Sequence, residues 1–275
     1  MPGWPLFSLG FAAQLTGDYA RAEALIQESA AVHRAQGNDS GVFHSESALA
    51  FLWLFTGKPA EAQAQIERVA TKWAHRGGRR MVSNLIYVQG LCALALGEPG
   101  RAQELVAEGL AISRKGGDRW NVALGTHYLG LVARATGDFA TAREQHQAAL
   151  ALMESLEEKL GIVFCLLGLG WAEQGLGDLA ASRAYFDEAL QIAAAIYVPP
   201  QVLEALTGIA SCLLAAGHPQ RARELLSTVV AHPATADPVR RQAQGLLSNC
   251  PEAPAAPAAQ ETAPDLEPLL AQFLH

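Results

Sequence analysis

The sequence is poor in charged residues: Asp, Glu, Lys and Arg make up only 17% of its 275 positions. The net charge is −7, and the basic residues are scattered. The densest basic cluster is the short segment RGGRR at 76–80, which falls between expected helices. A nucleic-acid surface normally needs a basic stripe or patch. We therefore expect no DNA or RNA partner.

Cysteine pairs, long apolar runs and a secretion signal are missing too. The four cysteines lie far apart and form no CxxC pair, which disfavours a disulfide framework or a metal site. No apolar segment reaches the ~20 residues of a membrane-spanning helix. The N-terminal segment MPGWPLFSLGFAAQL lacks the charged start of a secretory signal. These absences predict a cytoplasmic protein with reduced thiols and no membrane partner.

Catalytic motifs are also absent from the sequence. The eight histidines show no HxxxH or HExxH spacing, and no Ser or Cys lies in a nucleophile elbow. His127 and Tyr128 are neighbours, so their side chains would diverge on a helix. We predict that the chain is not an enzyme and that it uses no cofactor and no metal.

The sequence does contain a repeat of 40 residues. Each unit has a glycine, with a small residue seven positions before it and another five positions after it. Apolar residues recur at helical spacing on both sides of the glycine. The pattern predicts pairs of helices that bury their apolar faces by stacking on one another. The recurring glycines are Gly17, Gly57, Gly97, Gly137, Gly177 and Gly217.

Each glycine is expected just past the end of a first helix, because glycine adopts the left-handed conformation at little cost. The second helix then begins in one of two ways. Aspartates at positions 18, 138 and 178 can accept a hydrogen bond from a free backbone N–H. Prolines at positions 59, 99 and 219 suit the first helical position. The small residues, such as Gly130 and Ala142, predict a close crossing of the two helices.

When the 40-residue units are aligned, each recurring position forms a column. These columns resemble tetratricopeptide repeats, which have a small residue in the first helix, a glycine turn and an Ala-x-x-x-aromatic pattern in the second helix. Gly130, Gly137 and Ala142 match in order and spacing, although the usual unit has 34 residues. HEAT repeats have a period nearer 40 but do not require this arrangement. The resemblance implies an all-α fold: a right-handed α-solenoid of about six antiparallel helix pairs, with a capping helix at 237–250.

The longer unit is similar to the C-terminal arrays of bacterial signal-transduction ATPases with numerous domains, including maltose-regulator-like proteins. The similarity covers about residues 3–230. The chain departs from the whole regulators because it has no GxxxxGK[ST] phosphate-binding motif and no helix-turn-helix segment. The resemblance therefore implies the sensor or interaction arm of such a regulator, or a free-standing relative.

Composition divides the chain into three expected parts. Residues 1–250 form the solenoid, 251–264 an Ala/Pro-rich linker, and 265–275 a short amphipathic tail helix. At the N-terminal end, Trp4, Leu6, Phe7 and Phe11 are apolar. They either pack inward or contact another domain or a second copy of the chain. The tail is a second candidate for self-association, because it could fill a groove of its own or of a neighbouring chain.

The first helices of tetratricopeptide arrays line a concave groove, so the resemblance implies groove residues column by column. The implied partner-binding residues are His44, Ser47, Phe51, Asn84, Tyr87, Leu91, His127, Leu131, Arg134, Phe164, Trp171, Gln174, Glu204 and Thr207. Some members of the family clamp a carboxylate with basic residues, but His44 and Ser47 occupy those columns here.

The groove is largely apolar and aromatic, which favours a protein or peptide partner: an apolar peptide or a partner helix bound by a non-catalytic scaffold. A small-molecule inducer is the alternative ligand. Ordinary packing between repeats is the alternative for single aromatic residues such as Tyr87 and Trp171. Both kinds of ligand remain open at this point.

Overall fold

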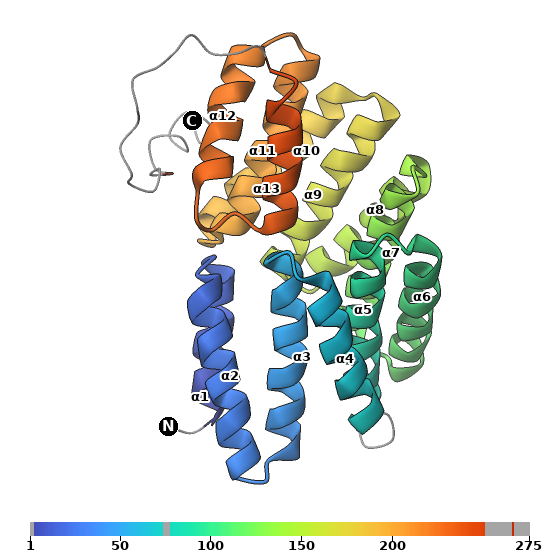
Figure 1. The fold of residues 1–275 in the computed structure, drawn as a ribbon. Helices are drawn as coiled ribbons and strands as arrows, with labels where there is room; N and C mark the ends of the chain where they lie inside the picture. The colour runs from blue at the N-terminus through green and yellow to red at the C-terminus, as the bar shows by residue number, and fades with distance from the viewer. Residues whose placement is uncertain (1–2, 74–77, 251–265, 267–275) are drawn as a thin grey trace.

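The computed structural model describes residues 3–73, 78–250 and Leu266, without the side chain of Arg79 (Figure 1). This part of the chain contains thirteen α-helices and no strand, which confirms the predicted all-α fold class. None of these helices is long and apolar enough to cross a membrane. The helices are α1 (Gly3–Leu15), α2 (Tyr19–Ala35), α3 (Asp39–Phe55), α4 (Pro59–Trp73), α5 (Arg79–Ala95), α6 (Pro99–Gly116), α7 (Arg119–Ala135), α8 (Phe139–Ser155), α9 (Lys159–Leu176), α10 (Leu179–Ala195), α11 (Pro199–Ala215), α12 (Pro219–Ala231) and α13 (Asp237–Leu247).

The predicted turns are present in every pair. All six recurring glycines have φ between 72° and 86°, the left-handed conformation that the sequence predicts. Asp138 caps α8 by accepting a hydrogen bond from the backbone N–H of Thr141, and aspartates 18 and 178 cap α2 and α10 in the same way. Pro99 begins α6 without such a cap. The two kinds of helix start are therefore both confirmed.

The small residues make room for a large side chain on the second helix. A side chain at Gly130 would collide with the ring of His146, and one at Gly170 would collide with the ring of Phe186. The expected partner of Gly130 was Ala142, whereas the tightest contact is with His146, four residues later in the same helix. The glycine is thus needed because the neighbouring ring occupies its side-chain space.

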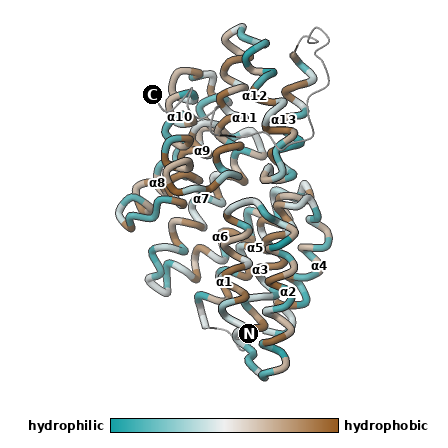
Figure 2. Tube along the Cα trace, turned by 90° about the vertical axis from the view of Figure 1, so that its left-hand side faces the viewer, coloured by the Kyte–Doolittle hydropathy of each residue, from teal (hydrophilic) through white to brown (hydrophobic). Residues whose placement is uncertain are grey.

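The helices stack in chain order, with the odd-numbered first helices on the inner side. In Figure 2, hydrophobic residues run through α9 and α11, whereas the second helices α2 and α4 carry more hydrophilic residues. The largest core cluster, here called the C-terminal core, comprises buried residues of α9 to α13 and the segment between α12 and α13. Smaller apolar clusters lie between the helices of the other repeats, so each repeat buries apolar residues against its neighbours.

The two ends of the array meet, which the sequence does not predict. The Tyr19 hydroxyl donates a hydrogen bond of 3.0 Å to the carbonyl oxygen of Ala234, across 215 positions of the chain. Side chains of Leu15, Tyr19 and Phe55 pack against the C-terminal core. Figure 1 shows α12 and α13 directly above the N-terminal helices.

The expected capping helix at 237–250 forms as α13, but its position corrects the prediction. It packs on α11 and α12, as a cap should, and it also contacts α3 at the other end of the array. Asp237 approaches so closely that a side chain at Gly57 would collide with its carboxylate. The helix α13 therefore lies against the inner face of the array, between its two ends, and does not only cover the outer face of the last repeat.

The remaining boundary predictions have different outcomes. The linker at 251–264 and the tail at 265–275 lie outside the described residues, except for Leu266, which packs against the C-terminal core. On α1, Leu6 is fully buried, but Trp4 and Phe11 are 42% and 45% exposed. Complete inward packing of this end is therefore wrong. Self-association stays a prediction.

Candidate functional site

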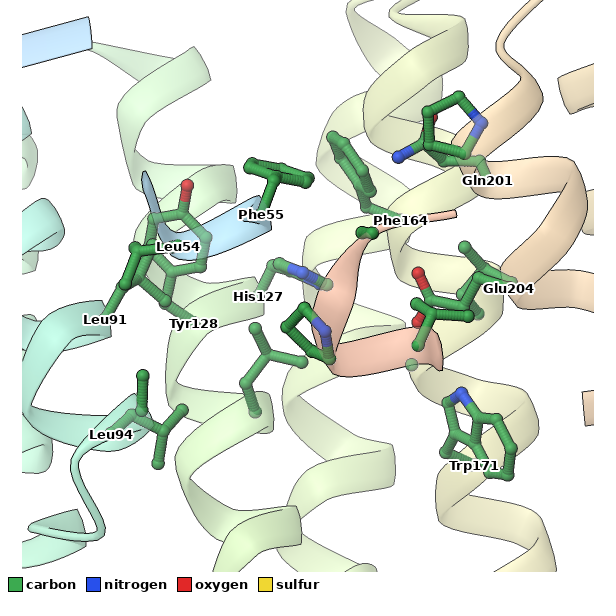
Figure 3. Close-up of a pocket in the computed structure, with 18 of the residues that line it drawn as sticks. Leu54, Phe55, Leu91, Leu94, His127, Tyr128, Phe164, Trp171, Gln201 and Glu204 are labelled. Atoms are coloured by element: carbon green, nitrogen blue, oxygen red, sulfur yellow. The ribbon is translucent and has the colours of Figure 1, made fainter. Parts of the chain in front are cut away.

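The inner face contains a partly open cavity of about 430 Å³. Five first helices, α3, α5, α7, α9 and α11, contribute to its wall, and α13 closes it. Figure 3 shows apolar side chains from several helices converging on this space, among them Leu54, Phe55, Leu91 and Phe164. The cavity lies within the roughly 300–1,000 Å³ that is typical of small-molecule sites.

Most of the predicted groove residues line this cavity. These residues occupy equivalent positions in successive first helices. Because the helices stack, equivalent positions lie on the same wall. The predicted residues on the cavity wall are Phe51, Leu91, His127, Leu131, Arg134, Phe164, Trp171 and Glu204.

Three other predicted residues lie apart, in a smaller pocket of about 180 Å³ between α3 and α5. They are His44, Ser47 and Asn84. Arg80 also lines this pocket, and its guanidinium pairs with Asp118 at 3.3 Å. The predicted groove is thus divided into two separate spaces.

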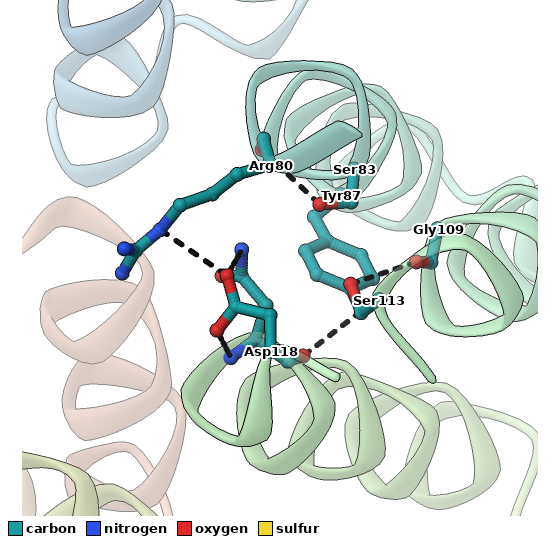
Figure 4. Close-up of polar contacts among 7 residues, drawn as sticks. Arg80, Ser83, Tyr87, Gly109, Ser113 and Asp118 are labelled. Carbon is teal, nitrogen blue, oxygen red and sulfur yellow. Dashed lines mark hydrogen bonds and ion pairs between the residues drawn. The ribbon is translucent and has the colours of Figure 1, made fainter. Parts of the chain in front are cut away.

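Tyr87 belongs to the core between repeats. Its side chain is 1% exposed, and its hydroxyl donates a hydrogen bond of 2.9 Å to the carbonyl oxygen of Asn121 (Figure 4). The same hydroxyl lies 3.1 Å from Ser113 Oγ. For this residue, the alternative of ordinary packing between repeats describes the structure.

Gln174 and Thr207 line neither space. Gln174 donates a side-chain hydrogen bond to the Ser211 hydroxyl on the adjacent first helix. Thr207 is fully buried, and its hydroxyl donates to the carbonyl oxygen of Leu203 within α11. Both side chains therefore contribute to packing and hydrogen bonding inside the array.

Several cavity residues escaped the sequence prediction. Leu54 and Leu94 occupy the same column as Arg134, three positions before a turn glycine, so a complete use of that column would have found them. Gln201 lies one helical turn before Glu204 and shares its face. Pro238 and Val239 belong to α13, and no repeat column indicates that this helix reaches the inner face.

Besides Arg134 Nε, three buried polar atoms on the cavity wall have no hydrogen-bond partner among the described residues. They are His127 Nδ1, Trp171 Nε1 and Gln201 Oε1. Their side chains are only 6%, 8% and 5% exposed. Buried polar atoms are nearly always hydrogen-bonded, and an unbonded one costs roughly 1–3 kcal/mol. Three such atoms around one cavity indicate a place where a ligand supplies the missing partners.

Two ionisable side chains, Arg134 and Glu204, also line this largely apolar space. Burial raises the pKa of the Glu204 carboxyl, and the nearby Arg134 partly offsets that rise. The Trp171 N–H is also near enough to lower this pKa, although its geometry falls short of a full hydrogen bond. Burial lowers the pKa of Arg134, whose Nε atom has no partner among the described residues.

His127 on the cavity wall forms a pair of buried histidines with His146. The rings of His127 and His146 are 4.9 Å apart, and His146 is fully buried between Gly130 and Gly168. Burial, with a smaller contribution from Arg134, lowers the pKa of His127 to about 3. Burial also lowers the pKa of His146 well below its usual range. Both rings are therefore neutral at physiological pH.

Sequence models of the tetratricopeptide repeat match residues 3–28, 44–68, 121–195 and 172–232. The chain belongs to the tetratricopeptide repeat family. A search of curated protein sequences finds no significant match.

Solved structures support the tetratricopeptide fold. A Rap protein complexed with Competence and Sporulation Factor is similar at a TM-score of 0.67 and 11% identity, over 89% of this chain and 73% of that one. The second is a STAND protein with a tetratricopeptide repeat sensor from Pyrococcus horikoshii. Its TM-score is 0.55 at 13% identity, over 90% of this chain and 38% of that one. BtubC from P. vanneervenii gives a TM-score of 0.56 at 16% identity, over 88% and 97% of the two chains.

Proposed function

We propose that this tetratricopeptide protein is a non-catalytic binding module that holds a small ligand in the cavity closed by α13. The observation that carries the proposal is the set of unpartnered polar atoms on His127, Trp171 and Gln201, all buried on the wall of one cavity. Apolar walls with a few convergent polar groups are typical of small-ligand sites.

The size of the cavity distinguishes the two ligands that the sequence leaves open. An α-helix is at least about 10 Å wide and rises 5.4 Å per turn, so one turn fills roughly 400 Å³. A cavity of about 430 Å³ therefore has room for about one turn of a partner helix while α13 is in place. The size of the cavity therefore favours a small ligand bound inside the array, either the small-molecule alternative or a very short peptide.

The chemistry of the wall favours binding over catalysis. A general base works best when its pKa lies near the operating pH. His127, the imidazole on the wall, has a pKa of about 3 and therefore accepts a proton poorly at neutral pH.

The closed array suggests how binding could be passed on to a partner. Phe55 on α3 and Val239 on α13 both line the cavity, so a bound ligand would touch the two ends of the array at once. By this proposal the chain is the sensor arm of a bacterial regulator or a stand-alone relative, acting as an interaction scaffold in the cytoplasm. The Rap complex and the STAND sensor are similar arrays for which a bound factor and a sensor are named.

The test is a thermal-shift screen of the purified chain with metabolite and short-peptide libraries. A ligand at 100 times its Kd should stabilise the folded state by about 2.7 kcal/mol. Leu131→Trp places a larger side chain on the cavity wall and should abolish the shift while the helical circular dichroism is retained. Leu176→Trp changes an exposed residue outside the cavity and is the matched control.

Two results would contradict the proposed function. One is the absence of any stabilising compound in either library. The other is a ligand that stabilises the wild-type chain and the Leu131→Trp variant equally.

A further inference from the structure

We propose that the ligand is a small zwitterion with an apolar body, whose anionic group pairs with Arg134 and whose cationic group pairs with Glu204. This inference rests on the proposed function and specifies the ligand class for the same cavity. It requires that the two charges need external partners, that the wall is polar at two separate places, and that the space between these places is apolar.

The two charged side chains have no ion-pair partner within the part of the chain that the structure describes. None of the ion pairs among the described residues includes Arg134 or Glu204. Both residues line the cavity. An uncompensated buried charge costs several kcal/mol, and a ligand with one charge would satisfy only one of the two.

The unpartnered polar atoms also form two groups, acceptors on α11 and a donor on α7. Gln201 Oε1 and the Glu204 carboxylate are acceptors one turn apart on α11, where a cationic group would fit. Arg134 Nε is a donor on α7, where an anionic group would fit. Figure 3 shows Gln201 and Glu204 together on one side of the cavity, and His127 of α7 on the other.

The positions of the helices separate the two charges. The first helix α9 lies between α7 and α11 and packs against both. Neighbouring helix axes are about 8–10 Å apart. Across this gap the Arg134 and Glu204 side chains come close enough to shift each other's pKa, but they form no ion pair with each other. Two or three extended residues span about 7–11 Å. A di- or tripeptide with free ends therefore fits better than a free amino acid, whose two charges lie on one carbon atom.

The middle of the cavity is suited to an apolar body. Phe51, Leu91 and Phe164 line it together with Leu131. Its volume is on the order of fourteen times the 30 Å³ share of one liquid water molecule. This is space for a dipeptide of apolar residues, in which the side chains contact the walls and the two ends reach the charged groups.

The experiment is isothermal titration calorimetry of the full chain with L-leucyl-L-leucine and three analogues. N-acetyl-Leu-Leu lacks the ammonium group, Leu-Leu amide lacks the carboxylate, and N-acetyl-Leu-Leu amide lacks both. We expect the zwitterion to bind at least tenfold more tightly than either singly charged analogue. L-phenylalanine and 6-aminohexanoate test how the two charges of the ligand must be arranged. L-phenylalanine carries both charges on groups attached to one carbon atom, whereas 6-aminohexanoate has separated charges and no peptide bond.

Two variants assign each charge to its residue. Arg134→Met should remove the preference for the acid over the amide and keep the preference for the free amine. Glu204→Gln should do the reverse. Because each variant is compared with itself across ligands, a general loss of stability changes all affinities and cannot mimic this pattern. Circular dichroism checks that each variant is folded.

The inference is overturned if N-acetyl-Leu-Leu amide binds as tightly as Leu-Leu, or if no member of the zwitterion series binds below 10 mM (about −2.7 kcal/mol). In either case the proposed function survives if another compound from the libraries binds and is excluded by Leu131→Trp. The proposed function fails separately, when no compound of any charge binds in the cavity.

Discussion

Tyr87 and His127 occupy the same repeat column, ten residues before a turn glycine, yet their surroundings differ. The Tyr87 ring fills the space beside Gly109 and Gly125, and its hydroxyl is hydrogen-bonded in the core. His127 lies on the cavity wall with an unpartnered nitrogen. A column therefore specifies the helix face on which a residue lies. The neighbouring side chains and the closing helix decide whether that face becomes core or site.

The largest effect on stability should come from removing the side chain of Tyr87, the core residue of this pair. Tyr87→Ala should destabilise the chain by about 3–5 kcal/mol, because it deletes a buried ring and its hydrogen bonds. Tyr87→Phe keeps the ring and should cost about 1 kcal/mol. Urea unfolding measures both. The comparison fails if Tyr87→Ala unfolds like the wild-type chain and merely loses ligand binding.

His127, the residue on the cavity wall, should make the stability of the array sensitive to acid. His127 and His146 have pKa values below 6.5 in the folded chain, whereas unfolded histidines take up protons as the pH falls through about 6.5. Stability is therefore lost on acidification, by about 2 kcal/mol for each histidine at pH 5.

Phe186 shows how to remove part of this effect. Its ring lies between Gly170 and Gly208, as His146 lies between Gly130 and Gly168. His146→Phe should thus be accommodated and should reduce the loss of unfolding free energy between pH 7 and pH 5. An unchanged pH dependence in the variant would show that His146 is not neutral in the folded chain.

The contact between Tyr19 and Ala234, which joins the two ends of the array, can be tested in the same way. Tyr19→Ala should cost about 1–3 kcal/mol and should increase hydrogen exchange in α13, since the Tyr19–Ala234 hydrogen bond and the packing on the C-terminal core are lost. Tyr185→Ala is the matched control, because Tyr185 packs on the same core without bridging the ends. Equal exchange in α13 for both variants would contradict the closure.

The smallest effect concerns a turn rather than the inner face. Tyr197 has φ of 57° and is 83% exposed, in the turn between α10 and α11. Tyr197→Gly should stabilise the chain by up to about 1 kcal/mol, because glycine adopts this conformation without strain. Thermal unfolding measures the change, and a lower melting temperature would mean that the exposed ring makes a stabilising contact.

The regular part of the fold could be predicted from the sequence because its causes are local. Turn glycines, capping aspartates and prolines act within a few residues, so they gave the helix pairs and their register. A second left-handed column, at Gly37, Gly117, Glu157 and Tyr197, was missed because two of its members are not glycine.

The cavity could be predicted only in part. Columns placed His127, Trp171 and Glu204 on the inner face, which is where they lie. The closure depends on the accumulated curvature of all the repeats, which no single column encodes. For that reason α13 was expected at an outer end, whereas it lies against α3 and contributes to the wall of the cavity.

The most direct test of the account is native mass spectrometry of the wild-type chain and the Leu131→Trp variant, each mixed with the same ligand from the stabilisation screen. We predict one ligand bound to each wild-type chain and none to the variant, with both proteins folded. Equal occupancy of the two proteins, or binding by a partner helix that the filled cavity does not impair, would contradict the claim that the cavity on the inner face is the binding site.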